Sequence, residues 1–232
     1  MRRTLRILSV ALITAGCVIL VDAGLTLAWK EPVSAIYAQL KQDEANDQLR
    51  QLEQTFSSDP EVVRLAETPD PEVRARRLAR LFARRLKPGT GIGKITIPAA
   101  GIDYVIVEGT DAATLEKGPG RYPETALPGQ GKTIGIAGHR TTYGAPFRKI
   151  NKIEEGDEIV VEMPYATFTY EFQKAKIVEP TDTHIVGDIG REQVVLTACH
   201  PLYSAAQRYA VFGVLSEVEF PPTAPGRPDR TS

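Results

Sequence analysis

The chain has 232 residues, of which 42% are hydrophobic, and a formal net charge of −1. This length fits one domain with appended segments, and the near-zero charge gives no support for nucleic-acid binding. There are two cysteines, and one of them, Cys17, lies in an apolar N-terminal stretch. A disulfide framework is therefore excluded, which leaves Cys199 as a lone thiol in the rest of the chain.

The N-terminus predicts a membrane anchor at residues 1–30. Three arginines within the first six residues precede an apolar stretch, residues 7–29, whose only charge is Asp22. As a helix this stretch is about 34 Å long, enough to cross a hydrocarbon core of about 30 Å. The arginines place the N-terminus in the cytoplasm and the remainder outside it. A cleaved secretory signal is the alternative, and it exports the same remainder.

Residues 31–88 predict a helical stalk, because apolar residues recur there at nearly helical spacing. Pro60 and Pro71 each follow an aspartate, a pattern typical of helix starts. Residues 73–87 contain seven basic and no acidic side chains. This basic segment is either a surface for anionic lipid or wall polymer or a solvated helix face, and the second interpretation is favoured.

Residues 89–220 have a different sequence pattern, in which short β-rich runs alternate with Gly and Pro turns. Seven or eight such strands with few helical patterns predict a mainly β barrel or sandwich. The tail, residues 221–232, is rich in Pro, Thr and Arg and is predicted to be disordered. The runs are 92–97, 104–108, 132–137, 158–162, 167–178, 193–197 and 209–219.

Reactive side chains fall at the ends of these predicted strands: His139, Cys199 and Arg208. A thiolate is a strong nucleophile, a histidine can return a proton to a leaving amine, and an arginine can stabilise an oxyanion. Together they predict acyl transfer through a thioester. Taken singly, each also has an ordinary interpretation: a buried small thiol, a structural histidine and a surface charge.

His200 competes with His139 for the role of base. Adjacent residues of a strand face opposite sides, so we expect His200 to point away from Cys199. A metal site made of Cys199, His139 and His200 has no recognised ligand spacing and no evident fourth ligand. We therefore expect neither a metal nor another cofactor.

Long segments in chain order resemble the class E sortases, which are cysteine transpeptidases of high-GC Gram-positive bacteria. The segments are residues 107–130, 136–147 and 199–208, within a likeness that covers about residues 90–218. The resemblance implies an eight-stranded sortase-type β-barrel with short helices. It also implies that Cys199 is the nucleophile, His139 the general acid and base, and Arg208 the group that stabilises the substrate and the oxyanion.

The same resemblance implies a substrate and its binding residues. The substrates would be surface proteins with a Leu-Ala-X-Thr-Gly or Leu-Pro-X-Thr-Gly sorting signal, cleaved between Thr and Gly. The acceptor would be an amine of the cell-wall precursor lipid II or a pilin lysine. Tyr122, Thr197 and Ala198 are the implied substrate-binding residues, and Tyr122 matches a tyrosine that class E enzymes link to Leu-Ala-X-Thr-Gly preference.

One departure from the family pattern lies beside the nucleophile. The pattern Thr-Leu-X-Thr-Cys reads Val-Leu-Thr-Ala-Cys here, so Val195 and Ala198 replace threonines. Ala198 has no hydroxyl group, so we expect no side-chain hydrogen bond from residue 198 to the substrate. Two other functions stay open, a pilin-polymerising sortase and a catalytically inactive binding module. The only tryptophan is Trp29, which disfavours a pilin-specific lid carrying an Asp-Pro-Trp plug.

Overall fold

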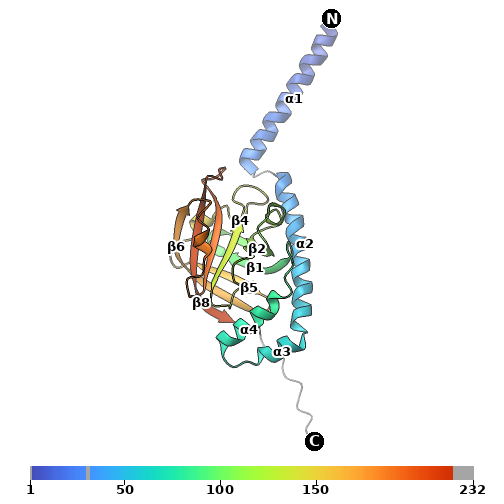
Figure 1. Cartoon of the computed structure of the whole chain (residues 1–232). Coiled ribbons are helices and arrows are strands. Elements are labelled where there is room, and N and C mark those ends of the chain that lie inside the picture. The colour runs from blue at the N-terminus through green and yellow to red at the C-terminus, as the bar shows by residue number, and fades with distance from the viewer. Residues whose placement is uncertain (1, 30–31, 222–232) are drawn as a thin grey trace.

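A closed eight-stranded barrel forms the centre of the molecule (Figure 1), with strand order β1-β2-β3-β4-β7-β8-β6-β5. The computed structural model describes residues 2–29 and 32–221, so the predicted disorder of the tail concerns residues almost wholly outside this part. The mainly β, eight-stranded prediction is confirmed. The strands are β1 (Gly91–Ile97), β2 (Ile102–Glu108), β3 (Gly120–Arg121), β4 (Thr133–Gly138), β5 (Glu158–Met163), β6 (Ala166–Val178), β7 (Gln193–His200) and β8 (Gln207–Glu219).

Strand β7 shows how the barrel sorts its side chains. Val194, Leu196 and Ala198 belong to the main core cluster inside the barrel. Val195 is also buried, but it belongs to a separate cluster on the other face of the sheet, with Ala210 and Phe212 of β8. Because side chains alternate along a strand, Thr197 and Cys199 share the face of Val195.

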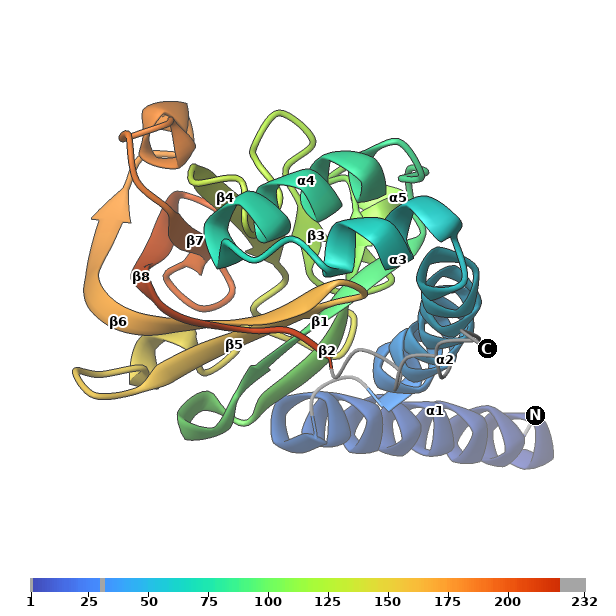
Figure 2. The same ribbon diagram turned by 90° about the horizontal axis from the view of Figure 1, so that it is seen from below.

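The helices cover the barrel on one side and at one end. Figure 2 shows α3 and α4 crossing the end of the barrel, while α2 runs alongside it. Phe56 of α2 and Phe82 of α4 are fully buried and meet edge to face, with ring centroids 5.2 Å apart. The helices are α1 (Arg2–Trp29), α2 (Pro32–Ser57), α3 (Pro60–Ala66), α4 (Pro71–Ala83) and α5 (Ala112–Leu115), with short 3-10 turns η1 (Pro98–Ala100), η2 (Ile150–Lys152) and η3 (Thr183–Val186).

Aspartates cap the two short helices at the predicted positions. Asp59 accepts a hydrogen bond from the Glu61 amide at 2.7 Å. Asp70 accepts from the amides of Glu72 and Val73 at 2.9 and 3.0 Å. In each helix a proline follows the cap, where the missing N–H costs nothing because the first turn has no intrahelical partner for it.

The predicted stalk packs against the barrel and is not a free spacer. On α2, Ala38, Ala45 and Leu49 are buried. The side chain of Gln42 acts like a neighbouring strand for β2: it accepts from the Val105 amide at 2.8 Å and donates to the Val105 carbonyl at 3.1 Å and the Lys117 carbonyl at 2.6 Å. The buried amide of Gln42 is the part of this contact that the spacing of apolar residues does not reveal.

The basic segment 73–87 packs one face of α4 onto the domain. Leu78, Ala79 and Phe82 are buried, whereas most of the basic side chains are exposed. Arg85 is paired with Asp59. Figure 1 places α4 at the end of the barrel away from α1, which argues against contact with membrane lipid.

Helix α1 has the length and composition of a membrane-spanning helix. Arg3–Val21 form a 19-residue window with a mean hydropathy of 2.2, and none of the window is buried against the rest of the chain. The exposed leucine, isoleucine and valine side chains of this window suit an apolar environment.

Candidate active site

The half-buried thiol of Cys199 lies near the end of β7. In the antiparallel pair of β7 and β8, Cys199 is directly opposite Arg208. In the parallel pair of β4 and β7, Gly138 is the partner of Ala198, so His139 and Cys199 are the next residues of the two strands. Neighbouring strands lie about 4.8 Å apart, so the structure brings these three side chains to one end of one sheet face.

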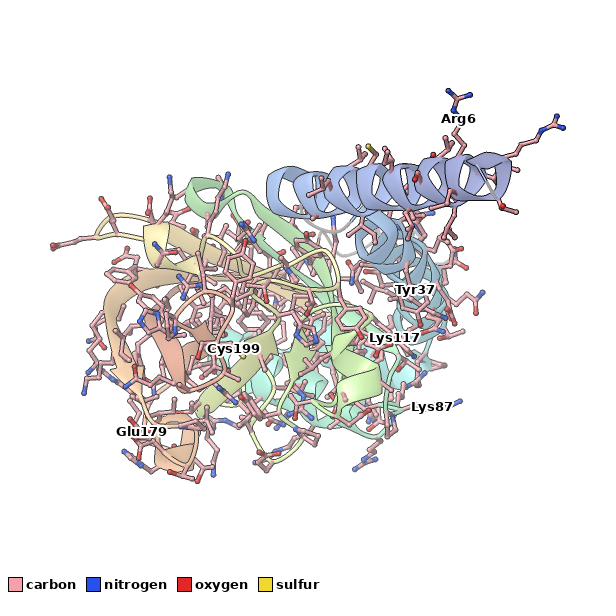
Figure 3. All side chains as sticks on the ribbon, turned by 90° about the horizontal axis from the view of Figure 1, so that it is seen from above. Arg6, Tyr37, Lys87, Lys117, Glu179 and Cys199 are labelled. Carbon is pink, nitrogen blue, oxygen red and sulfur yellow. The ribbon has the colours of Figure 1, made fainter. Side chains whose placement is uncertain are left out.

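Cys199 lies on the barrel and away from α2. Figure 3, which views the molecule from above, shows Cys199 over the strands and Tyr37 of α2 to the right of it. The thiol is free. Helix α2 therefore leaves the strand end that carries Cys199 uncovered.

The side chain of Arg208 is held by the turn that precedes β8. Its Nη1 donates to the carbonyls of Ala205 and Gln207, both at 3.0 Å. A guanidinium has five N–H donors and no acceptor, so these bonds leave donors of Arg208 for a carbonyl or an oxyanion. The residue is half-buried, which keeps the charge accessible to a ligand at the strand end.

His139 is half-buried, and both its carbonyl and its ring have contacts with the loop that follows it. The Phe147 amide donates to the His139 carbonyl at 2.9 Å, and the ring of Tyr143 lies 5.1 Å from the imidazole, centroid to centroid. Burial lowers the pKa of His139, while the negative charge of Glu116 acts in the opposite direction. The imidazole is therefore mostly neutral near pH 7, ready to accept a proton.

Tyr122 and Thr197 form a pair beside the nucleophile. Their hydroxyl oxygens lie 2.8 Å apart. Tyr122 can lie across the sheet because residue 135 is glycine, whose added Cβ would come within 2.7 Å of the Tyr122 ring. The preceding Arg121 fixes the segment through a bidentate pair with Glu108, at 2.8 and 2.5 Å. Thr197 is only 3% exposed, so the surrounding residues largely shield its hydroxyl from a ligand.

The expected substrate contact of Ala198 is wrong for its side chain. Ala198 is 2% exposed and belongs to the main core cluster, on the face opposite Cys199. Alternation along β7 is the reason: a residue next to the nucleophile in sequence must point into the barrel.

His200 also points away from Cys199. Its ring contacts Tyr209, with centroids 5.9 Å apart, and its Nδ1 lies 3.0 Å from Nη1 of Arg140. Arg140, Tyr143 and Glu116 are further neighbours of the site, which the sequence pattern did not indicate. A charged residue directly after a buried strand was the available signal for Arg140. Among the residues that the structure describes, no three His, Cys, Asp or Glu side chains are grouped to hold a metal ion.

A thiol, an imidazole and a guanidinium at one end of a closed barrel define a site for nucleophilic acyl transfer. Residues 95–216 match the sortase domain, and the chain therefore belongs to the sortase family, whose members are cysteine transpeptidases.

Curated relatives include sortases of the D and E kinds. The chain is 39% identical to sortase D of Bacillus subtilis over 133 residues, which is 55% of this chain and 66% of the relative. It is 33% identical to sortase SrtE1 of Streptomyces coelicolor over 159 residues, 62% of this chain and 45% of the relative. The matched region is therefore less than two thirds of either relative.

Solved structures agree with this fold. A sortase D5 transpeptidase of Clostridium perfringens matches with a TM-score of 0.61 and 25% identity, over 75% of this chain and 99% of that one. Sortase E1 of Streptomyces coelicolor, solved with a tripeptide in its active site, matches with a TM-score of 0.54 and 30% identity, over 60% and 98%.

Proposed function

We propose that the chain is a membrane-anchored transpeptidase that cleaves a Leu-Ala-X-Thr-Gly or Leu-Pro-X-Thr-Gly sorting signal between Thr and Gly. The observation that carries this proposal is the register that puts His139, Cys199 and Arg208 together at one strand end. Helix α1 is the proposed single-pass anchor, with its arginines in the cytoplasm and the barrel outside. The proposed acceptor is an amine of the cell-wall precursor lipid II.

The proposed chemistry uses one group for each demand. His139 takes the proton of the Cys199 thiol, the resulting thiolate Sγ attacks the Thr carbonyl carbon, and Arg208 donates to the oxyanion that forms. His139, as the imidazolium, gives its proton to the departing Gly amine, which leaves a thioester on Cys199. An incoming amine then attacks the thioester, His139 takes its proton, and collapse of the second oxyanion frees the thiolate and the new amide.

We place the enzyme in class E, on the motifs around Tyr122 and Cys199. The hydrogen bond of Tyr122 to Thr197 supports this placement, because it fixes a phenol beside the nucleophile where it meets an incoming peptide. The 39% identity to sortase D favours class D as the second candidate. A pilin-polymerising role needs the same site with a lysine acceptor.

A peptide panel tests the proposed function and its class. We expect the full chain, in detergent micelles, to cleave a fluorogenic Leu-Ala-X-Thr-Gly peptide in preference to its Leu-Pro-X-Thr-Gly counterpart. Tyr122→Phe removes the hydroxyl that meets Thr197 and should reduce the ratio of the two kcat/KM values about five- to tenfold, since one hydrogen bond contributes about 1 kcal/mol. Thr125→Ser is a control of similar size nearby. A preference for the Pro peptide contradicts class E, and binding of both without cleavage supports the inactive module.

The pH profile provides a separate test of His139. Glu116→Gln removes the negative charge that raises the pKa of His139, so that pKa should fall further. The imidazolium is then scarcer near pH 7, so we expect kcat/KM there to fall about two- to fivefold. The acidic limb of the profile should move to lower pH. An unchanged limb, or one that moves to higher pH, contradicts the assignment of His139.

A further inference from the structure

Arg140 is a buried cation directly after His139. Its side chain is only 5% exposed. No carboxylate of the described residues lies within ion-pair distance of it, and its Nε has no hydrogen-bond partner. Burying a charge without a counter-charge destabilises a fold, and burial lowers the pKa of Arg140 accordingly. The guanidinium can offset this destabilisation only through polar contacts, which an apolar side chain cannot make.

The guanidinium of Arg140 connects three chain segments behind the site. Nη1 donates to the Cys199 carbonyl at 3.3 Å and to His200 Nδ1 at 3.0 Å, both at the end of β7. Nη2 donates to the side-chain oxygen of Asn151 in η2 at 2.8 Å. The guanidinium carbon also lies 5.4 Å from the ring centroid of Tyr209 in β8. Arg140 itself belongs to the connection that begins with His139.

These contacts bear on the nucleophile through its backbone. Arg140, His200 and Tyr209 lie on the face of the sheet opposite the thiol, so Arg140 does not block the substrate side. Its bond to the Cys199 carbonyl ties the nucleophile's own peptide unit to the chain that carries His139.

Resting on the proposed function, we propose that Arg140 is a positioning residue of the transpeptidase reaction, which locks the Cys199 end of β7 to the His139 loop. This lock, made by the contacts of Arg140 with Cys199, His200 and Asn151, keeps the thiolate and the imidazole correctly placed relative to each other through both acyl transfers. It also assigns His200: a guanidinium can only donate, so Nδ1 of His200 is an acceptor and its ring belongs to the lock.

Substitution of Arg140 by an apolar residue of similar length tests the proposal. Arg140→Met fills the same buried space and removes the unpaired charge, so it should fold. We expect kcat for the sorting-signal peptide to fall about 10- to 100-fold with KM changed less than about threefold, since misplaced reacting groups slow chemistry and not binding. Arg140→Lys keeps the charge but not the fork, and should fall between wild type and Arg140→Met. Arg77→Met, on the exposed face of α4, is the matched control and should leave kcat unchanged.

A second measurement does not depend on the peptide. In a Cys17→Ser background, Cys199 is the only thiol. We expect Arg140→Met to slow its alkylation by iodoacetamide about three- to tenfold, because the peptide unit of Cys199 loses its bond to Arg140 and the thiol is no longer held beside the imidazole that can accept its proton. If wild type cleaves no peptide, the proposed function fails while this alkylation result still supports or rejects Arg140.

The outcomes separate a positioning role from a purely structural one. Unchanged kcat and unchanged alkylation in folded Arg140→Met overturn the proposal, as does a loss of activity that only follows the unfolded fraction in a thermal melt. If Arg140→Met does not fold, Asn151→Leu removes one anchor of the guanidinium at an exposed site. A lowered kcat with unchanged KM then supports the proposal, and kcat equal to wild type overturns it.

Discussion

Replacement of Cys199 by alanine is expected to reduce cleavage of the Leu-Ala-X-Thr-Gly peptide by at least about 10⁴-fold, because no other group can form the acyl-enzyme. Ala keeps the backbone that bonds to Arg140, so the fold should persist. Fluorogenic cleavage by the full chain in micelles measures the effect, and peptide binding to the variant should survive.

Cys17→Ser is the control for the nucleophile, since Cys17 lies in α1. It should cleave like wild type. Mass spectrometry of the wild type, quenched during turnover, should show the peptide's acyl fragment on Cys199. Robust turnover by Cys199→Ala would rule out the thioester mechanism.

His139→Ala is expected to lower kcat about 10²- to 10⁴-fold, the usual contribution of a general acid and base. His200→Ala should lower it less than about tenfold, because His200 acts only through the lock formed by Arg140. Both variants should bind the peptide, so the comparison rests on kcat.

The two histidines control for each other, because His139 directly follows β4 and His200 ends the neighbouring strand β7. His184 in η3, outside the site, offers a third comparison, and His184→Ala should leave kcat unchanged. The opposite ranking, with His200→Ala the worse variant, would move the base to the other face of β7.

Strong periodic patterns made much of the barrel predictable. The run 167–178 corresponds to β6 and the run 92–97 to β1, each within one residue. Strand β3 has two residues, Gly120–Arg121, and is too short to carry any pattern. The order of the strands depends on pairing between distant segments, such as β4 with β7, which local periodicity does not contain.

The candidate site, like the barrel, was only partly predictable from the sequence. A strand end marked His139 and Cys199 as candidates, and the resemblance named their roles. Burial decided the rest: Ala198 is adjacent to the nucleophile in sequence, yet its methyl group packs in the core. We therefore expect that having alanine instead of threonine at position 198 affects core packing and stability, and not substrate recognition. Arg140 was missed because its partners come from β7 and η2.

The packing of α2 on the barrel limits the reach of the enzyme. If residues 31–88 were a flexible linker, the root-mean-square distance between the domain and its anchor would be about 40 Å. With α2 fastened to β2 through Gln42, only the residues between Trp29 and Pro32 separate the apolar helix from the catalytic body. Under the proposed function, with α1 as the anchor, the strand end that carries Cys199 would work at a nearly constant height above the bilayer. A substrate held by its own membrane segment would have to present its sorting signal at that height, so the spacing between signal and membrane would become part of substrate selection.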